Sequence, residues 1–277
     1  MNNISGPIAV FDSGYGGLTV FQELRKKLPN NDFIYLGDNA RAPYGTRSFD
    51  IVYEYTLEAV KELFSMGAHL VILACNTASA KALRTIQQKD LPNIDSNKRV
   101  LGVIRPSVEY VAEITKTAMV GVLGTTGTVQ SLSYPLELQK QSSNIEVYQE
   151  ACPMWVPLVE NGESNKAGAD YFVKQHIEKL LQLNSDIDTV ILGCTHYPML
   201  MDKIKLYTPA HINILSQGSI VANSLVDYLQ RHPKMDKKCT RGGSVQYYTT
   251  ENADKFKQTA GFFLKQDIEV TQINLFQ

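Results

Sequence analysis

The sequence contains no apolar run of the roughly 18 residues that a membrane-spanning helix requires. Polar residues, a glycine and a proline follow closely on Met1, so no secretory signal segment is predicted. Net charge is also nearly absent, because 27 Lys and Arg stand against 28 Asp and Glu. Such a chain offers nucleic acid or an anionic membrane little attraction. These absences predict a cytoplasmic protein with neither nucleic-acid nor membrane partners.

Cysteine is scarce, and the four cysteines stand far apart at positions 75, 152, 194 and 239. Wide spacing in a cytoplasmic chain does not suggest a disulfide framework, so reduced thiols are expected. A metal site is not expected either. Zinc needs three or four protein ligands, and only His196 stands close to a cysteine, in a Cys-x-His pair with Cys194. We expect Cys152 to pack.

Short apolar runs alternate with segments of helical spacing, which predicts α/β architecture with mainly parallel sheets covered on both faces. Strands are predicted at residues 8–11, 33–36, 70–74, 100–104, 119–123, 145–149, 189–192, 212–215 and 244–249. Helices are predicted at residues 16–28, 48–66, 78–88, 125–141, 167–183, 198–207, 221–229 and 251–264.

The alternation restarts after a chain crossing near residues 104–106, and a return is expected near residues 216–218. This restart predicts two similar doubly wound domains. Residues 1–104 and 216–277 would form the first, and residues 105–215 the second. With 277 residues and 44% hydrophobic content, each domain can bury a core.

Two segments resemble each other, and each carries a cysteine after an apolar run. Residues 71–77 read VILACNT, and residues 190–196 read VILGCTH. A buried strand followed by Cys and hydrogen-bonding side chains places a thiol at the carboxyl end of a sheet, where sites form in such folds. Either cysteine alone is more typical of packing. As a matched pair, Cys75 and Cys194 suggest two thiols that exchange a proton with one substrate.

A glycine-rich turn at residues 12–17 (DSGYGG) follows the first strand, and its backbone N–H groups suit an anion. It is no dinucleotide fingerprint, because Thr19 replaces the third glycine. Asp12 is either a functional carboxylate or a cap. Glu160 is either buried or on a helix surface, and His196 is an acid/base candidate. Lys81 is expected to point outward, so no lysine for pyridoxal phosphate is evident.

Several motifs occur in an order and spacing that resemble bacterial glutamate racemases. They are residues 11–20 (FDSGYGGLTV), 43–45 (PYG), 74–79 (ACNTAS), 124–129 (GTTGTV), 157–160 (PLVE) and 193–198 (GCTHYP). The resemblance covers residues 8 to about 200. It implies two α/β domains related by a pseudo-twofold axis with the active site between them. It also implies a cofactor-independent isomerase that makes D-glutamate from L-glutamate for peptidoglycan, hence for the bacterial cell wall and cell shape.

The resemblance further implies roles for individual residues. Cys75 would accept the α-proton of D-glutamate and Cys194 that of L-glutamate, with Asp12 and His196 assisting and Glu160 as a candidate helper. The substrate-binding residues implied are Asp12, Ser13, Tyr44, Gly45, Asn76, Thr77, Thr195 and His196. The resemblance implies no cofactor, and its members commonly form homodimers.

Three other readings stay open from the sequence. A racemase of the same family could act on aspartate or another amino acid, since the residues that read the substrate side chain are not identifiable. A thiol redox or metal-binding protein would need cysteines that come together in space. A two-lobed solute-binding module would bind an amino acid without exchanging its α-proton.

Overall fold

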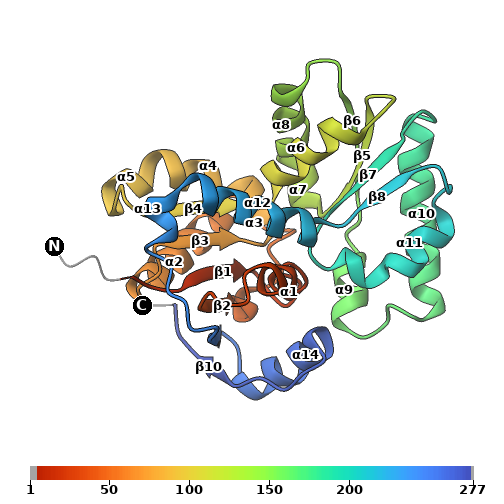
Figure 1. Cartoon of the computed structure of the whole chain (residues 1–277). Coiled ribbons are helices and arrows are strands. Elements are labelled where there is room, and N and C mark those ends of the chain that lie inside the picture. The colour runs from red at the N-terminus through yellow and green to blue at the C-terminus, as the bar shows by residue number, and fades with distance from the viewer. Residues whose placement is uncertain (1–4, 276–277) are drawn as a thin grey trace.

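The computed structural model describes residues 5–275, in which two parallel β-sheets lie side by side, each flanked by helices (Figure 1). The first sheet has the strand order β10-β9-β2-β1-β3-β4, and the second has the order β6-β5-β7-β8. The strands are β1 (Ile8–Asp12), β2 (Phe33–Gly37), β3 (Leu70–Leu73), β4 (Arg99–Gly102), β5 (Met119–Gly124), β6 (Glu146–Ala151), β7 (Thr189–Gly193), β8 (Asn213–Leu215), β9 (Val245–Thr249) and β10 (Val270–Gln272).

Helices cover both faces of the first sheet, as β1 illustrates. Every residue of β1 is buried. Ile8 and Val10 join the core cluster that contains α1 and α12, whereas Ala9 and Phe11 join the cluster that contains α2. The helices are α1 (Leu18–Lys27), α2 (Phe49–Ser65), α3 (Asn76–Lys81), α4 (Leu83–Thr85), α5 (Leu91–Ile94), α6 (Ile104–Ile114), α7 (Thr126–Gln130), α8 (Ser133–Gln141), α9 (Trp155–Glu160), α10 (Ala167–Leu183), α11 (Met201–Tyr207), α12 (Gln217–Arg231), α13 (Pro233–Asp236) and α14 (Ala253–Leu264), with 3₁₀ turns η1 (Asn39–Arg41) and η3 (Tyr197–Leu200) and a π-helical turn η2 (Ile86–Asp90).

The two sheets share a strand order. The run β2-β1-β3-β4 of the first corresponds to β6-β5-β7-β8 of the second. The loops after β1 and β5 therefore correspond, as do the loops after β3 and β7. Cys75 follows β3 and Cys194 follows β7, so the matched segments of the sequence occupy equivalent places. The predicted architecture of two mainly parallel α/β units is confirmed; the exact domain boundaries stay a prediction.

Among residues 5–275, helices α5, α6, α9 and α13 lie where the sequence indicated none. The strand predicted at residues 100–104 ends at Gly102, and α6 begins two residues later. Likewise α9 occupies part of what looked like a loop. Both α6 and α9 have a proline as their third residue, Pro106 and Pro157. Proline is tolerated in the first turn because the first N–H groups of a helix have no intrahelical partner.

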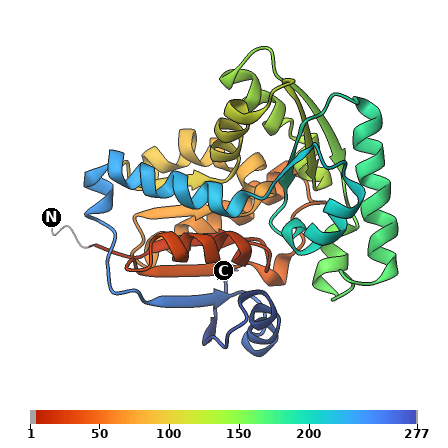
Figure 2. The same ribbon diagram turned by 45° about the vertical axis from the view of Figure 1, so that its right-hand side comes forward.

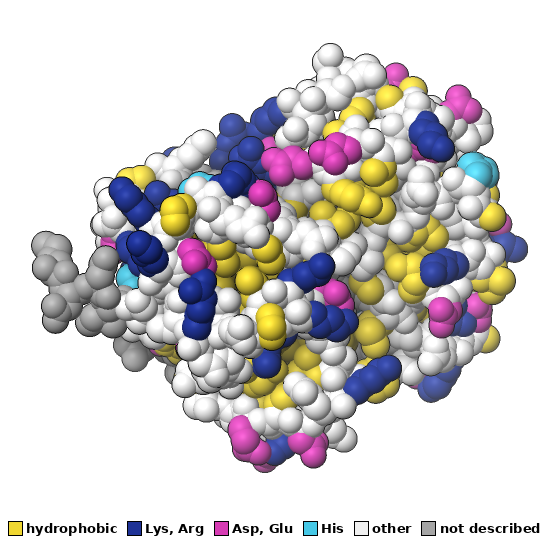
Figure 3. Space-filling view, viewed as in Figure 1, with side chains coloured by type: hydrophobic (Ala, Val, Ile, Leu, Met, Phe, Trp, Pro, Cys, Tyr) yellow, Lys and Arg dark blue, Asp and Glu magenta, His cyan; other side chains and the backbone are white. Residues whose placement is uncertain are grey.

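The end of the chain returns to the first sheet. Helix α12 packs along α1, and β9 pairs in parallel with β2, so the last strands extend the sheet that β1 began (Figure 2). On the face seen in Figure 3, basic and acidic side chains are interspersed, in keeping with the small net charge. Within residues 5–275, no helix combines the length and apolar character needed to cross a membrane.

Candidate active site

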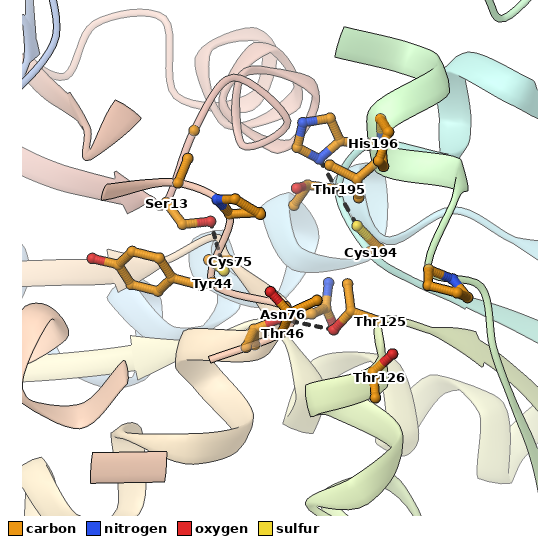
Figure 4. Close-up of a pocket in the computed structure, with 18 of the residues that line it drawn as sticks. Ser13, Tyr44, Thr46, Cys75, Asn76, Thr125, Thr126, Cys194, Thr195 and His196 are labelled. Carbon is orange, nitrogen blue, oxygen red and sulfur yellow. Dashed lines mark hydrogen bonds between the residues drawn. The ribbon is translucent and has the colours of Figure 1, made fainter. Parts of the chain in front are cut away.

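A cavity of about 110 Å³ opens where the carboxyl ends of the two sheets meet, a size that suits a small molecule. Its walls come from the loops after β1, β2 and β3 and from those after β5, β6 and β7. The lining residues are Ser13, Gly14, Ala42, Pro43, Tyr44, Gly45, Thr46, Cys75, Asn76, Thr77, Thr125, Thr126, Cys152, Pro153, Val156, Pro157, Glu160, Cys194, Thr195 and His196. Figure 4 shows Cys75 and Cys194 on opposite sides of this pocket.

Cys75 caps the N-terminus of α3. Its Sγ accepts from the Ala78 N–H at 3.4 Å and lies 3.3 Å from Ser13 Oγ. Burial, followed by the negative charge of Asp12, raises the pKa of Cys75 to about 12, although both hydrogen bonds act in the opposite direction. At neutral pH this group is therefore a thiol, able to give a proton rather than take one.

Cys194 has a different neighbourhood. His196 Nδ1 lies 3.9 Å from Cys194 Sγ, and His196 Nε2 lies 2.9 Å from Glu160 Oε1. Burial lowers the pKa of His196, but hydrogen bonds with Cys194 and Glu160 outweigh it and raise the pKa to about 10. At neutral pH His196 is an imidazolium that donates to both neighbours. The imidazolium N–H is therefore placed to donate to the Cys194 sulfur.

Asp12 lies behind the pocket wall. It is 1% exposed, and its Oδ2 accepts from the Gly14 N–H at 2.9 Å. Burial raises its pKa, and the positive charge of His196 acts against that rise. Because Asp12 is not among the lining residues, its negative charge acts on the thiol of Cys75 from behind. Its predicted contact with substrate stays a prediction.

The glycine-rich turn also packs closely, and its predicted use as an anion cradle stays a prediction. A Cβ on Gly16 would collide with the side chains of Thr195 and His196, and one on Gly17 would collide with Asp12. Thr19 Oγ1 in turn donates to the Thr195 carbonyl at 2.9 Å. Gly16 therefore allows the Cys194 turn of one unit to approach the loop after β1 of the other, and Gly17 allows this loop to lie close to Asp12.

Threonine hydroxyls form another wall. Thr77 Oγ1 lies 2.9 Å from Thr125 Oγ1, and Thr125 Oγ1 donates to Thr128 Oγ1 at 3.1 Å. These contacts join α3 of one unit to the N-terminus of α7 in the other, beside Thr126 and Thr46 in Figure 4. The interpretation of the sequence missed Thr125. Its position after β5 matches that of Ser13 after β1, so the repeat carried a signal for it.

The loop after β2 closes the pocket. Its Tyr44 hydroxyl donates to Asp38 and points away from the two thiols (Figure 4). Arg41 Nε also donates to Asp38, at 2.7 Å. The carbonyl of Gly45 accepts from the Gly127 N–H at 2.7 Å, across the boundary between the sheets. Tyr44 and Gly45 both line the pocket, but the Tyr44 hydroxyl is occupied elsewhere.

One expectation about a single side chain, Lys81, needs correction, and a second, Cys152, gains an addition. Lys81 was expected to point outward, yet it is 8% exposed and its Nζ donates to the Arg47 carbonyl at 2.5 Å. Its aliphatic stem is buried where α3 meets the loop after β2 and the start of α7. Cys152 is buried as predicted, but it also lines the pocket. Burial holds its pKa well above the usual range, so it stays a thiol.

Comparison with known proteins gives a consistent result. A family model described as Asp/Glu/hydantoin racemase matches residues 18–224. A glutamate racemase from a Ruegeria species is 39% identical over 94% of this chain and 97% of its own length. The structure of a glutamate racemase isoform from Bacillus anthracis is similar with a TM-score of 0.89 at 34% identity, over 98% of both chains. The Francisella tularensis glutamate racemase, solved with D-glutamate, gives a TM-score of 0.87 at 31% identity, over 99% of both chains.

Proposed function

The chain belongs to the Asp/Glu/hydantoin racemase family, and we propose that it interconverts L-glutamate and D-glutamate by a two-thiol mechanism without a cofactor. The observation that carries the proposal is that Cys75 and Cys194, one from each unit, line opposite sides of one small pocket. A racemase must remove a proton from one face of a carbon and return one to the other face. A thiolate and a thiol so placed perform both steps.

In the L-to-D direction, the Cys194 thiolate takes the α-proton of L-glutamate while the Cys75 thiol gives its proton to the opposite face. The turnover leaves a thiolate at Cys75 and a thiol at Cys194, which is the state needed for the reverse direction. His196 supports the first state, because its imidazolium donates toward Cys194. Ser13 and the Ala78 N–H support the second, because both can donate to a Cys75 thiolate.

The α-proton of an amino acid is weakly acidic, so the site has to stabilise the carbanion-like transition state. Thr77, Thr125 and Asn76 line the same pocket as the two thiols, and Figure 4 shows Asn76 and Thr125 below both thiols. We assign the Asn76 amide to a substrate carboxylate, because a fixed donor is most effective in a dry pocket. The two threonine hydroxyls donate along the chain from Thr77 through Thr125 to Thr128 and so hold this wall in place. The product D-glutamate would supply peptidoglycan synthesis. The homodimer implied by the family resemblance stays a prediction that light scattering can test.

The test is an incubation of the purified protein with L-glutamate and, separately, with L-aspartate, followed by circular dichroism and by NMR detection of α-deuterium in deuterated water. We expect loss of optical activity and α-deuteration with glutamate. Turnover of aspartate without turnover of glutamate would show that the protein is an aspartate racemase. Binding of glutamate without exchange of its α-proton would reject the racemase altogether.

A further inference from the structure

Gln217, the first residue of α12, takes part in a closed ring of buried side chains. It is 3% exposed. Its Oε1 accepts from Asn76 Nδ2 at 2.6 Å, and its Nε2 donates to the Tyr134 hydroxyl at 2.9 Å. The Tyr134 hydroxyl donates in turn to Asn76 Oδ1 at 2.7 Å. Each of the three side chains is thus bound to the other two.

The direction of every hydrogen bond in this ring follows from one backbone carbonyl. Ser107 Oγ donates to the Val103 carbonyl at 2.8 Å, and Gln217 Nε2 approaches the same two oxygens, at 2.8 Å from Ser107 Oγ and 3.3 Å from Val103 O. A carbonyl only accepts, so Gln217 must turn its NH₂ group toward it and its Oε1 toward Asn76. Asn76 must then present Nδ2 to Gln217 and Oδ1 to Tyr134.

This ring determines what Asn76 offers to the pocket. Asn76 lines the cavity directly after Cys75. Its Nδ2 gives one hydrogen to Gln217, and within residues 5–275 no second acceptor is recorded for the other. We propose that Gln217 is a positioning residue that fixes the Asn76 amide, so that its remaining N–H is held ready for a substrate carboxylate. The proposal rests on the proposed function, since a carboxylate accepts hydrogen bonds and an inverted amide would present it with an oxygen.

The ring also joins the two units. Asn76 belongs to α3, whereas Tyr134 belongs to α8, which packs on α6 beside the second sheet. Gln217 and Val103 lie at the two places where the chain passes between the sheets. A purely architectural role for Gln217 is therefore the competing explanation. The two explanations differ in whether the effect of Gln217 on substrate passes through Asn76.

The decisive experiment is a double-mutant cycle with Gln217→Met, which keeps the side-chain length and removes its hydrogen bonds, and Asn76→Ala. We expect Gln217→Met to raise KM for both enantiomers on the order of tenfold with little change in kcat. In the Asn76→Ala background the same change should leave KM unaltered. Additive effects on KM would overturn the proposal. Gln87→Met is the control, because it removes one Gln side-chain bond, to the Val100 carbonyl, away from the pocket.

Two further measurements distinguish positioning of Asn76 from an architectural role of Gln217. Tyr134→Phe leaves the Asn76–Gln217 bond in place and should change KM less than twofold; a rise equal to that of Gln217→Met would contradict the proposal. In protein labelled with ¹⁵N-asparagine, the Asn76 NH₂ signal should exchange slowly with solvent and should lose that protection in Gln217→Met. An unchanged signal would overturn the ring's role. This spectrum is readable even if the wild-type protein does not racemise glutamate, a result that would reject the proposed function alone.

Discussion

The two thiols of the pocket have different sets of neighbours. Cys75 lies against Ser13 and near the negative charge of Asp12, and its pKa is raised to about 12. Cys194 lies beside an imidazolium that Glu160 helps to hold. Cys75 is therefore suited to give a proton, and a donor lies ready at Cys194 for the reaction step that needs a thiolate there.

The first prediction concerns the thiols. Cys75→Ala or Cys194→Ala should reduce racemisation of glutamate by roughly three orders of magnitude or more, because each removes an acid/base group. Cys239→Ala is the control, since that thiol is buried and donates to the Met235 carbonyl outside the pocket. Cys152→Ala should also leave racemisation largely intact, because its thiol stays protonated. Normal racemisation by Cys194→Ala in a chiral assay would end the two-thiol account.

The second prediction uses a β-halogenated glutamate, from which one base can remove the α-proton while halide leaves the β-carbon. Each single-thiol variant should catalyse this elimination from one enantiomer only. Cys75→Ala should act on the L form and Cys194→Ala on the D form. At neutral pH Cys194→Ala should be on the order of tenfold slower or more, because its remaining acid/base thiol, Cys75, has a raised pKa. Release of halide reports the rate, and equal rates would contradict the difference between the thiols.

The third prediction concerns pH. Glu160 raises the pKa of His196, so Glu160→Gln should lower it and His196 should lose its proton at lower pH. The pH above which kcat/KM for L-glutamate declines should then be lower by about one unit. Glu163→Gln is the matched control, since Glu163 pairs with Lys166 at the surface. An unchanged pH of decline would show that the proton on His196 does not govern the reaction.

At the scale of elements, most of the fold could be predicted from the sequence. The strands β1, β3 and β7 are short apolar runs buried on both faces, which is a strong signal in a parallel sheet. Helices α6 and α9 were missed because Pro106 and Pro157 looked like boundaries. The long helix expected at residues 125–141 is in fact two, separated by Leu132 with a φ of +54°. A leucine with a left-handed backbone conformation cannot be recognised from the sequence, because glycine and asparagine are the residues usual there.

One short contact between elements has a clear acid dependence. Asp188 accepts from the N–H groups of Lys116 and Thr117 at 2.5 and 2.9 Å, which secures the turn before β5. Burial raises its pKa, but these bonds outweigh burial and lower it from 3.8 to about 2. Its stabilisation is therefore complete above about pH 4 and is lost as pH falls toward 2.

The fourth prediction follows from that contact. Asp188→Asn should lower the free energy of unfolding by about 1–3 kcal/mol at neutral pH, measured by urea denaturation. The variant should also lose less stability than the wild type between pH 4 and pH 2. Asp186→Asn, at an exposed neighbouring position, should change neither the free energy of unfolding at neutral pH nor its loss between pH 4 and pH 2. Equal acid sensitivity of Asp188→Asn and the wild type would refute the assignment.

At the scale of the whole molecule, the site exists only when the two units meet. The sequence identified the residues at each sheet edge from their place after strands. It could not show that Gly16 makes room for His196, or that Thr77 meets Thr125, because these contacts join distant segments. The ring at Gln217 was invisible for the same reason. Matched patterns predicted the two halves of the pocket, and packing determined how they face each other.

The fifth prediction tests this meeting of the units. A Cβ on Gly127 would lie 2.9 Å from the Gly45 carbonyl and 2.8 Å from Lys81 Nζ, so Gly127→Ala should hold the pocket open. We expect kcat/KM to fall on the order of tenfold with little loss of thermal stability, since each unit keeps its own core. Gly168→Ala, where a Cβ has open space, should leave kinetics unchanged. An active Gly127→Ala variant would show that this contact is not needed.

The most direct test of the two-thiol account is the isotope content of both enantiomers in the first turnovers in deuterated water. Starting from L-glutamate, the D-glutamate formed should carry deuterium at the α-carbon while the remaining L-glutamate keeps its hydrogen, because a different thiol serves each face. The reverse pattern should hold when the reaction starts from D-glutamate. Deuterium that enters the unreacted enantiomer as fast as the product would mean that one group serves both faces, and it would contradict the account.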